Sequence, residues 1–299
     1  MSDDSARHRQ AAVRQKLRGI ALIILSGICF SAMSAISKHL GARLSFFEVA
    51  FFRSAFGWML VWPFVAAAGL SVLRTRHPGA HLMRGVASGG SVLAIFFSLT
   101  YLPLADATAY GFTRNLFIVV LAAMFLHEPI RRDRSLVAIV GFVGVLIMLR
   151  PQAGLNSASV VALGGALLAA GVIIIIKRLM RSERPVTVMF YFGLATTVIT
   201  GLPAFAYWVQ PTAQELLLLL VVGALGSAGQ TVMIMAYRIA DATVLAPFDY
   251  LQLVFATLLG FLAFSELPTA WTGAGAALIV LANLYNTRRG TALPVRAPV

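Results

Sequence analysis

Four ionisable side chains lie within long apolar stretches of the sequence, namely Glu48, Arg53, Arg114 and Asp249. A charge is costly in a hydrocarbon environment, so such a residue usually faces a partner or a water-filled cavity. An arginine can bind a carboxylate through two parallel hydrogen bonds, and a carboxylate attracts an ammonium or sulfonium cation. Arg114 and Asp249 therefore have the chemistry to hold the two ends of a zwitterion.

An internal repeat relates two of these charges to each other. The tetrapeptide Ala-Asp-Ala-Thr occurs at 105–108 and again at 240–243, and Arg114 and Asp249 follow the two copies at the same spacing. They occupy equivalent positions with opposite charge, so two halves that face each other would place both beside one central cavity. Two interpretations stay open: the pair binds a substrate, or it only stabilises the protein by pairing internally or with Glu48.

Aromatic and amide side chains close to these charges complete the candidate site. Ring faces attract cations and stack on aromatic groups. The predicted substrate-binding residues are Arg114, Asp249, Tyr110, Asn115, Tyr250, Phe112, Phe248 and Tyr237. Glu48, Arg53 and Asp249 form a second predicted set, an intramembrane charge network that includes a coupling group. For Glu48 and Arg53 the alternative is a polar network that only holds helices together.

The composition is that of a chain embedded in lipid. The 299 residues are 59% hydrophobic and only 12% charged, with a mean hydropathy of +0.85, whereas soluble domains have about 25% charged residues. Apolar blocks approach the ~20 residues that a helix needs to cross a bilayer. The net charge of +13 comes from Lys and Arg in the joints between these blocks, which argues against nucleic acid as a partner.

The apolar blocks predict an all-α integral membrane protein with ten transmembrane helices. The basic N-terminal segment is followed by an apolar block without a small-residue cleavage site, which predicts a retained first span. The expected spans are Gly19–Ser37, Phe46–Ala68, Leu82–Leu102, Ala109–His127, Ser135–Leu149, Ser159–Ile176, Thr187–Val209, Ala213–Tyr237, Val244–Phe264 and Ala270–Asn286.

The distribution of positive charge predicts the orientation. Outside the spans, nearly all of the 24 Lys and Arg residues fall in the two tails and in alternate joints, and only Lys38, Arg43 and Arg150 fall in the remaining joints. Because Lys and Arg favour the cytoplasmic side, both termini are expected in the cytoplasm. That arrangement requires an even number of spans.

The repeat divides the chain into two halves of five spans. Its first copy joins the third and fourth spans on the outer side, and its second joins the eighth and ninth on the inner side, so the halves have inverted topology. Inverted repeats are common in secondary transporters. The expected domains are a cytoplasmic tail (1–18), a first five-helix repeat (19–150), a second, inverted repeat (151–286) and a cytoplasmic tail (287–299).

Residues at the span ends have structural interpretations. Glu128 and Glu266 precede prolines and are interpreted as signals that end a span. Lys38 and Lys177 stand at the ends of equivalent spans, where a lysine can extend its amine to the interface. Small residues on one helix face, such as Gly85 with Gly89 and Gly273 with Ala277, predict close helix approach.

The sequence resembles the drug/metabolite transporter superfamily in its EamA-type branch, over nearly the whole chain. The five-plus-five arrangement, the Glu-Pro span endings and the Glu48…Arg53 pattern support the resemblance, and segments 37–44, 47–53 and 246–251 are similar to S-adenosylmethionine-transporter-like bacterial members. Asn115 stands where many relatives have a proline in the fourth span, which puts a helix break there in doubt.

The resemblance implies a secondary active transporter in the bacterial inner (cytoplasmic) membrane, moving an amino-acid-like or S-adenosylmethionine-like zwitterion by alternating access. The alternatives are a broad-specificity efflux transporter and, in another class, a membrane scaffold or sensor without flux. No phosphate loop, His-Glu-x-x-His or Gly-x-Ser-x-Gly motif occurs, so we expect no enzyme, metal or other cofactor. The expected partners are the lipid bilayer, a small-molecule substrate and a coupling proton or exchanged metabolite, with a homodimer left open.

Overall fold

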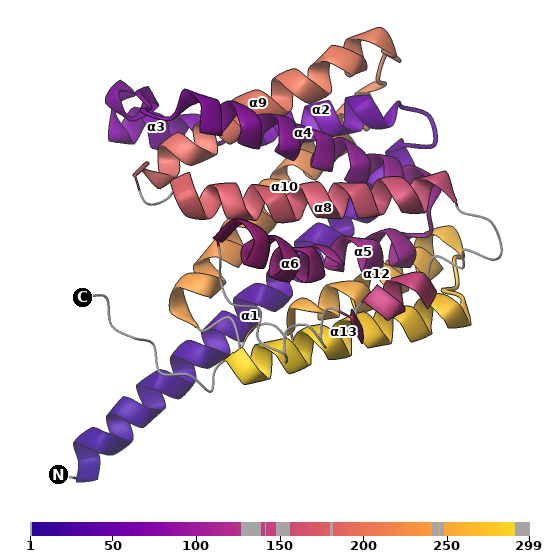
Figure 1. Cartoon of the computed structure of the whole chain (residues 1–299). Coiled ribbons are helices and arrows are strands. Elements are labelled where there is room, and N and C mark those ends of the chain that lie inside the picture. Colours follow the sequence, from indigo (N-terminus) through magenta and orange to yellow (C-terminus); the bar gives the residue numbers. More distant parts are fainter. Residues whose placement is uncertain are drawn as a thin grey trace.

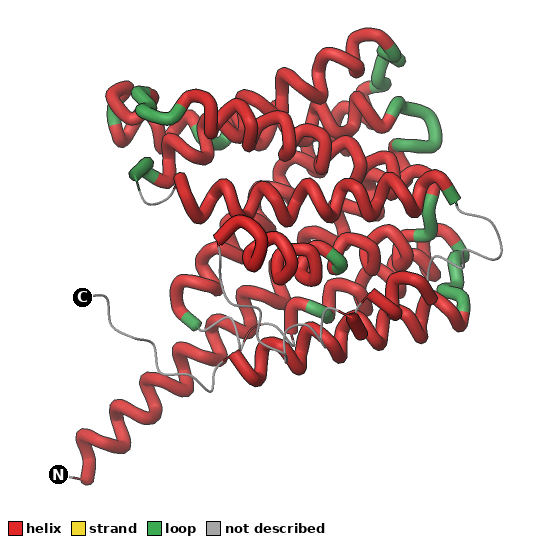
Figure 2. The backbone as a smooth tube through the Cα atoms, viewed as in Figure 1, coloured by secondary structure: helices red, strands yellow, loops and turns green. Residues whose placement is uncertain are grey.

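The computed structural model describes residues 2–126, 139–140, 142–147, 156–179, 182–240, 245 and 248–290. Over these residues the chain consists of helices and short connections, without a strand (Figures 1 and 2). The helices are α1 (Ser2–Leu40), α2 (Phe46–Met59), α3 (Trp62–Ala68), the 3-10 turn Leu70–Leu73, α4 (Pro78–Tyr101), α5 (Leu104–Phe112), α6 (Arg114–Leu126), α8 (Ser157–Leu179), α9 (Pro185–Ala206), α10 (Ala213–Ile239), α12 (Leu251–Phe264) and α13 (Ala270–Gly290).

Six segments of the described chain are long and apolar enough to cross a bilayer, and they confirm the predicted first, second, third, sixth, seventh and eighth spans. They are Val13–Leu40, Phe46–Ala68, Pro78–Tyr101, Ser157–Ile176, Pro185–Ala206 and Ala213–Tyr237. The predicted fourth span corresponds to α5 and α6, and the predicted ninth and tenth correspond to the shorter apolar helices Leu251–Phe264 and Ala270–Leu281. About half of the predicted fifth span, and Glu128 before it, lie outside the described residues.

Local sequence signals set where several helices begin. Ser45 and Glu48 form a capping box at the start of α2, and Thr212 and Glu215 form one at the start of α10. Each satisfies backbone N–H groups that lack a partner at a helix start. Helices α4 and α9 instead begin with a proline at their first turn, where the missing N–H costs little.

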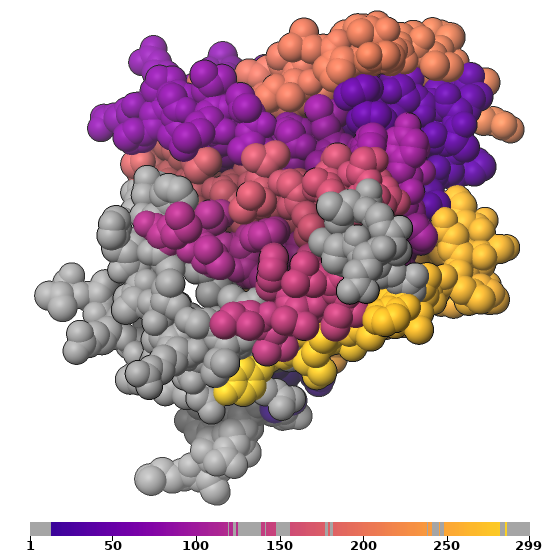
Figure 3. Space-filling view, turned by 45° about the vertical axis from the view of Figure 1, so that its right-hand side comes forward, coloured from indigo at the N-terminus to yellow at the C-terminus, as the bar shows by residue number. Residues whose placement is uncertain are grey.

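The helices of the two halves interlock in matched pairs. α1 packs along α10 as α8 packs along α4, α2 packs on α10 as α9 packs on α4, and α1 contacts α12 as α8 contacts α6. α2 also lies along α9, so segments far apart in the sequence share the upper part of the face in Figure 3. The main packing partners of each half therefore come from the other half.

Small residues permit the closest of these contacts. A Cβ at Gly85 would stand 2.5 Å from Cβ of Ala195, and one at Gly89 would stand 2.6 Å from Ile199. These contacts confirm close approach of α4 to α9. The same prediction is wrong for Gly273, where a Cβ would meet nothing within 4 Å.

Aromatic side chains gather at both ends of the α2–α9 pair. At one end Phe47 stacks on Tyr207, with ring centroids 5.4 Å apart. At the other end Trp58 and Trp62 both pack on Phe190. Aromatic rings are enriched at the two interfaces of a membrane, so the length of this pair matches a segment that spans the bilayer.

Lys38 corrects one sequence-based interpretation. Its amine does not extend to the interface but forms an ion pair with Glu266, with an N–O distance of 2.7 Å, and donates a hydrogen bond to the carbonyl of Leu102. Glu266 also accepts a hydrogen bond of 2.9 Å from the backbone N–H of Leu104. Direct pairing satisfies the buried amine, so solvent access is not needed. The side chain of Lys177 lies outside the described residues.

The first helix and the last run to the same side of the molecule. α1 begins at Ser2, so the predicted N-terminal tail is helical from its second residue. Its first residue and the C-terminal end of α13 lie on the left in Figure 1.

Candidate functional site

The predicted fourth span is interrupted at Thr113, between α5 and α6. The Thr113 N–H donates to the carbonyl of Tyr110 over 3.0 Å in a tightened turn, and the Thr113 hydroxyl donates to the same carbonyl over 2.6 Å. Thr113 is fully buried. The interruption makes Arg114 the first residue of α6. Asn115 stands where many relatives have a helix-breaking proline, yet the helix is interrupted two residues before it, at Thr113.

A second interruption lies close to the corresponding place in the other half, two residues further along the repeat. Phe248 and Asp249 are helical, Tyr250 forms a turn, and α12 begins at Leu251 with Tyr250 as its N-cap. Leu253 donates a hydrogen bond of 3.0 Å to the carbonyl of Tyr250. Interrupted helices within a bilayer are tolerated where they are buried in protein or line a cavity. Arg114 therefore directly follows one interruption, and Asp249 directly precedes the other.

The two predicted charges share one electrostatic environment. Arg114 and Asp249 act on each other, and both act on the phenol of Tyr237 near the end of α10. Within the described part of the chain, the ion pairs closer than 4.0 Å are Lys38–Glu266 and Arg43–Glu215. Arg114 and Asp249 thus interact across a longer gap than a direct ion pair.

Two further predicted residues join this group. The phenol of Tyr250 interacts with the side chain of Asn115 and with the charges of Asp249 and Arg114. Its ring packs at 4.9 Å, centroid to centroid, on that of Phe112. The side chain of Asn115 and the ring of Tyr250 thus connect the two interruptions directly.

The remaining predicted aromatic residues either pack in the core next to the group around Arg114 and Asp249 or pack against a different cluster. Tyr110 is buried, interacts with Ser159 of α8 and, like Phe112, belongs to a core cluster that includes Ile279 of α13. Phe248 packs instead against a separate cluster around Ile23 of α1. Tyr110 and Phe112 thus fix the position of α5, whereas Phe248 anchors its helix turn to α1.

The structure places Glu48 and Arg53 apart from this group. Glu48 is fully buried and accepts the N–H of Ser45 at 3.1 Å, and its electrostatic neighbours are Arg43 and Glu215. Arg53 lies against α10, where a Cβ at Gly226 would stand 3.3 Å from its Nε. Glu48 has a clear capping role, and a coupling role for either residue stays a prediction.

Little in the amino-acid sequence predicts the interruption at Thr113. Gly111 weakens the helix nearby, but a single glycine in an apolar span is a weak signal. The interaction between Asn115 and Tyr250 was not expected either, because it joins residues from different halves of the chain. Only their equivalent positions in the repeat could have suggested it.

Comparison with known proteins agrees with this architecture. The model of the EamA-like transporter family matches the chain twice, over residues 17–150 and 156–287. An S-adenosylmethionine uptake transporter of Rickettsia conorii is 35% identical over 92% of this chain and 94% of its own length. The pseudopaline exporter CntI of Pseudomonas aeruginosa (strain UCBPP-PA14) is 33% identical over 91% of this chain and 97% of its own.

Two further matches broaden the comparison. A riboflavin transporter of Rhizobium johnstonii is 33% identical over 90% of this chain and 91% of its own length. A protein of known crystal structure superposes with a TM-score of 0.64 at 23% identity, covering 94% of this chain and 99% of that chain. The superposition supports the fold, and the named relatives are all transporters.

Proposed function

Because the chain belongs to the EamA-like transporter family, we propose that it is a secondary transporter for a zwitterionic metabolite of the S-adenosylmethionine type, bound between Arg114 and Asp249. The observation that carries this assignment is that two opposite charges at equivalent positions of the repeat each stand next to a helix interruption. They influence each other without forming a direct ion pair. The gap between them is where a ligand with both charges fits.

The two ends of the site suit different groups of such a ligand. Arg114 is the first residue of α6, and a helix N-terminus itself favours an anion, so a substrate carboxylate belongs there. Asp249 faces an ammonium or sulfonium group, and the rings of Tyr237 and Tyr250 beside it are suited to a cation or a stacked base. The side chains of Asn115 and Tyr250, which come from the two sides of the site, interact with each other.

The relatives narrow the substrate class. Their names assign S-adenosylmethionine, pseudopaline and riboflavin to them as cargo. S-adenosylmethionine carries a carboxylate, an ammonium and a sulfonium group, which matches the two charges of the site. Riboflavin has no permanent charge and would leave Arg114 and Asp249 without partners, at a cost.

The transport mechanism we assign is alternating access by two inverted five-helix repeats, ten spans in all, with both termini in the cytoplasm of a bacterium. The matched packing of α1 on α10 and α8 on α4 supports it, as does the double match to the family model. In such proteins the halves rock around a central site. Uphill transport then uses an ion gradient or exchange, with Asp249 as the protonatable group closest to the substrate.

Counterflow in liposomes tests the substrate and the site together. Proteoliposomes loaded with unlabelled S-adenosylmethionine should accumulate the radiolabelled compound. R114A and D249A should each weaken its binding roughly ten- to hundredfold, because each removes a charge-assisted contact of about 1.5–3 kcal/mol. R14A, which removes an exposed arginine on α1, is the matched control and should transport normally.

Three outcomes would contradict the assignment. Undiminished binding of S-adenosylmethionine by both R114A and D249A would show that these two residues do not form the substrate site. Saturable flux of many unrelated compounds would favour a broad-specificity efflux transporter, which the pseudopaline exporter among the relatives makes the second candidate. A folded protein without flux across amino-acid and nucleoside-derivative panels would favour a scaffold or sensor.

A further inference from the structure

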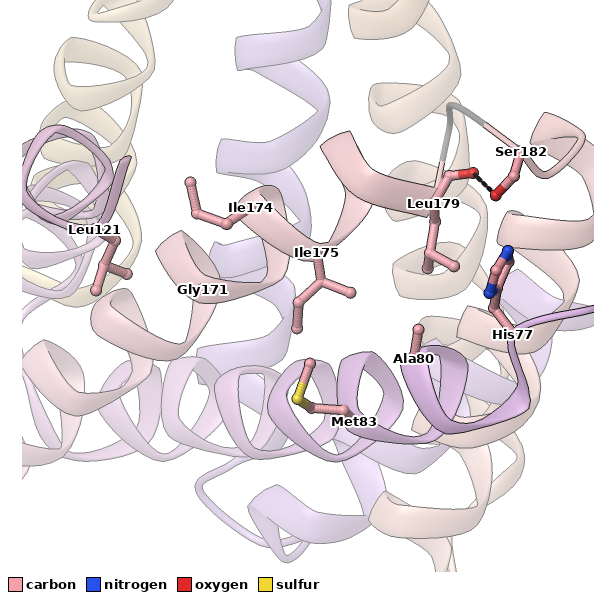
Figure 4. Close-up of a pocket in the computed structure, with 9 residues that line it drawn as sticks. All are labelled: His77, Ala80, Met83, Leu121, Gly171, Ile174, Ile175, Leu179 and Ser182. Atoms are coloured by element: carbon pink, nitrogen blue, oxygen red, sulfur yellow. Dashed lines mark hydrogen bonds between the residues drawn. The ribbon is translucent and has the colours of Figure 1, made fainter. Parts of the chain in front are cut away.

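A cavity that neither Arg114 nor Asp249 lines lies between α4, α8 and α6. It has a volume of about 480 Å³. Its wall is apolar along most of its length and polar at one end (Figure 4). The lining residues are His77, Ala80, Met83, Leu121, Gly171, Ile174, Ile175, Leu179 and Ser182.

The apolar part of the cavity is open at the surface of the protein. Met83 on α4 and Ile175 on α8 point toward each other across it in Figure 4, and Leu121 of α6 lies at the far end. The side chain of Met83 is 57% exposed, while that of Ile174 is buried. One wall thus opens to the surroundings of the helix bundle, and the predicted third span, Leu82–Leu102, would place Met83 next to lipid.

Two arginines are close in sequence to the residues at the polar end. His77 and Ser182 close the cavity there (Figure 4). Arg76 directly precedes His77, Arg184 comes two residues after Ser182, and both are exposed. The two joints are tied together because Glu183 accepts hydrogen bonds from the hydroxyl of Thr75, at 2.6 Å, and from the N–H of Arg76, at 3.1 Å. The carboxylate is occupied by these donors, so the nearby guanidinium groups are left for another anion.

We propose that this cavity binds an anionic phospholipid, with an acyl chain between Met83 and Ile175 and the phosphate at His77 and Ser182 beside Arg76 and Arg184. An apolar slot ending in exposed arginines matches that ligand in both charge and polarity. Juxtamembrane basic residues each strengthen attachment to anionic lipid by about 1 kcal/mol. The orientation proposed above would place the site in the cytoplasmic leaflet, but lipid binding itself does not depend on transport.

Glycines of α8 provide a matched test of the acyl-chain site. A Cβ at Gly171 would meet nothing within 4 Å, and the same holds for Gly164 on the same helix. Gly171 lines the cavity, whereas Gly164 is exposed and does not line it. G171L should fill the slot and abolish binding of phosphatidylglycerol to the delipidated protein, measured by native mass spectrometry. G164L should bind it as the unmodified chain does.

Arginine variants test the headgroup separately. R76Q/R184Q should weaken phosphatidylglycerol binding about thirtyfold, from two basic contacts at about 1 kcal/mol each, and should leave phosphatidylcholine binding unchanged. R14Q/R18Q removes the same charge from the exposed start of α1 and should bind normally. Equal binding by G171L and the unmodified chain would overturn the lipid site, as would a phosphatidylglycerol affinity that R76Q/R184Q leaves intact.

A transport measurement on the same variants tests whether the cavity holds the transported substrate and not a lipid. Loss of S-adenosylmethionine counterflow in G171L with lipid binding intact would make the cavity part of the substrate path and would overturn the lipid assignment. Failure of S-adenosylmethionine transport in the unmodified chain, with lipid binding intact, would contradict only the proposed function.

Discussion

Lys38 and Glu266 form an ion pair of 2.7 Å that joins the end of α1 to the connection between α12 and α13. The same two side chains bond the backbone on either side of the turn between α4 and α5, through the carbonyl of Leu102 and the N–H of Leu104. Three connections from both halves of the chain therefore meet at one pair of charges.

Breaking this pair on one side should destabilise the protein. K38M or E266Q leaves the other charge with only its backbone contact, and loss of one partner of a buried pair costs about 3–5 kcal/mol. Because the side chains here are 12% and 23% exposed, we expect the lower end of that range. Unfolding followed by tryptophan fluorescence in detergent micelles measures the loss. K38M/E266Q should recover part of it, and strictly additive losses would mean that the two residues are not coupled.

The hydrogen bonds to Glu183 predict a dependence of stability on pH. Burial opposes ionisation of this side chain, but the donors Thr75 and Arg76 outweigh it and hold the pKa of Glu183 below its usual value. A lowered folded-state pKa gives stability that is present above the unfolded value of about 4.3 and is lost as pH falls through the folded value.

Melting curves of the unmodified chain and E183Q across pH 3–8 measure this effect of Glu183. E183Q should melt at a lower temperature near neutral pH, and the difference should shrink below about pH 4. T75V removes one donor and should give a smaller loss with the same pH trend. A difference that is constant over the whole pH range would show that ionisation of Glu183 does not contribute.

Two glycines on α4 should respond oppositely to alanine. At Gly89 a Cβ would come within 2.6 Å of Ile199, whereas at Gly79 it would meet nothing within 4 Å. G89A should therefore cost about 1–3 kcal/mol through overpacking. G79A should be neutral or more stable by up to about 1 kcal/mol, because alanine favours the helix. If G89A and G79A were equally stable in an unfolding assay, α4 and α9 could move apart without a loss of stability.

Thiol labelling tests the proposed orientation. In a C29A background, L267C places a thiol at the connection before α13 and L70C places one after α3, and both positions are strongly exposed. A membrane-impermeant maleimide added to intact spheroplasts should label L267C and spare L70C until the cells are opened. The reverse pattern would invert the topology, and equal labelling would place both joints on one side.

The sequence predicted those features that depend on chain-wide patterns. Hydropathy predicted six spans that the structure confirms, because a bilayer demands long apolar helices whatever their neighbours. The repeat also predicted that Arg114 and Asp249 would lie near each other, since equivalent positions of two interlocked halves meet at the centre. The substrate role of this pair stays a prediction.

Features that depend on single distant contacts were not predictable. Lys38 was assigned to the interface because nothing near it in the sequence could pair with it, and its partner Glu266 comes from the other half. Glu48 was assigned to a charge network, although Ser45 three residues earlier is the signature of a capping box. Phe248 packs against the cluster around Ile23 of α1, because the position of a ring on its helix turn determines which neighbouring helix it contacts.

The interlocked packing of the two halves bears on biosynthesis. α1, α2 and α4 leave the ribosome first, yet their main neighbours are α8, α9 and α10. Until α8, α9 and α10 are inserted, lipid must therefore cover the glycine-containing faces of α1, α2 and α4. Neither half is an autonomous folding unit, and a chain truncated after the first family match would present unfilled grooves to the cell's quality-control proteases.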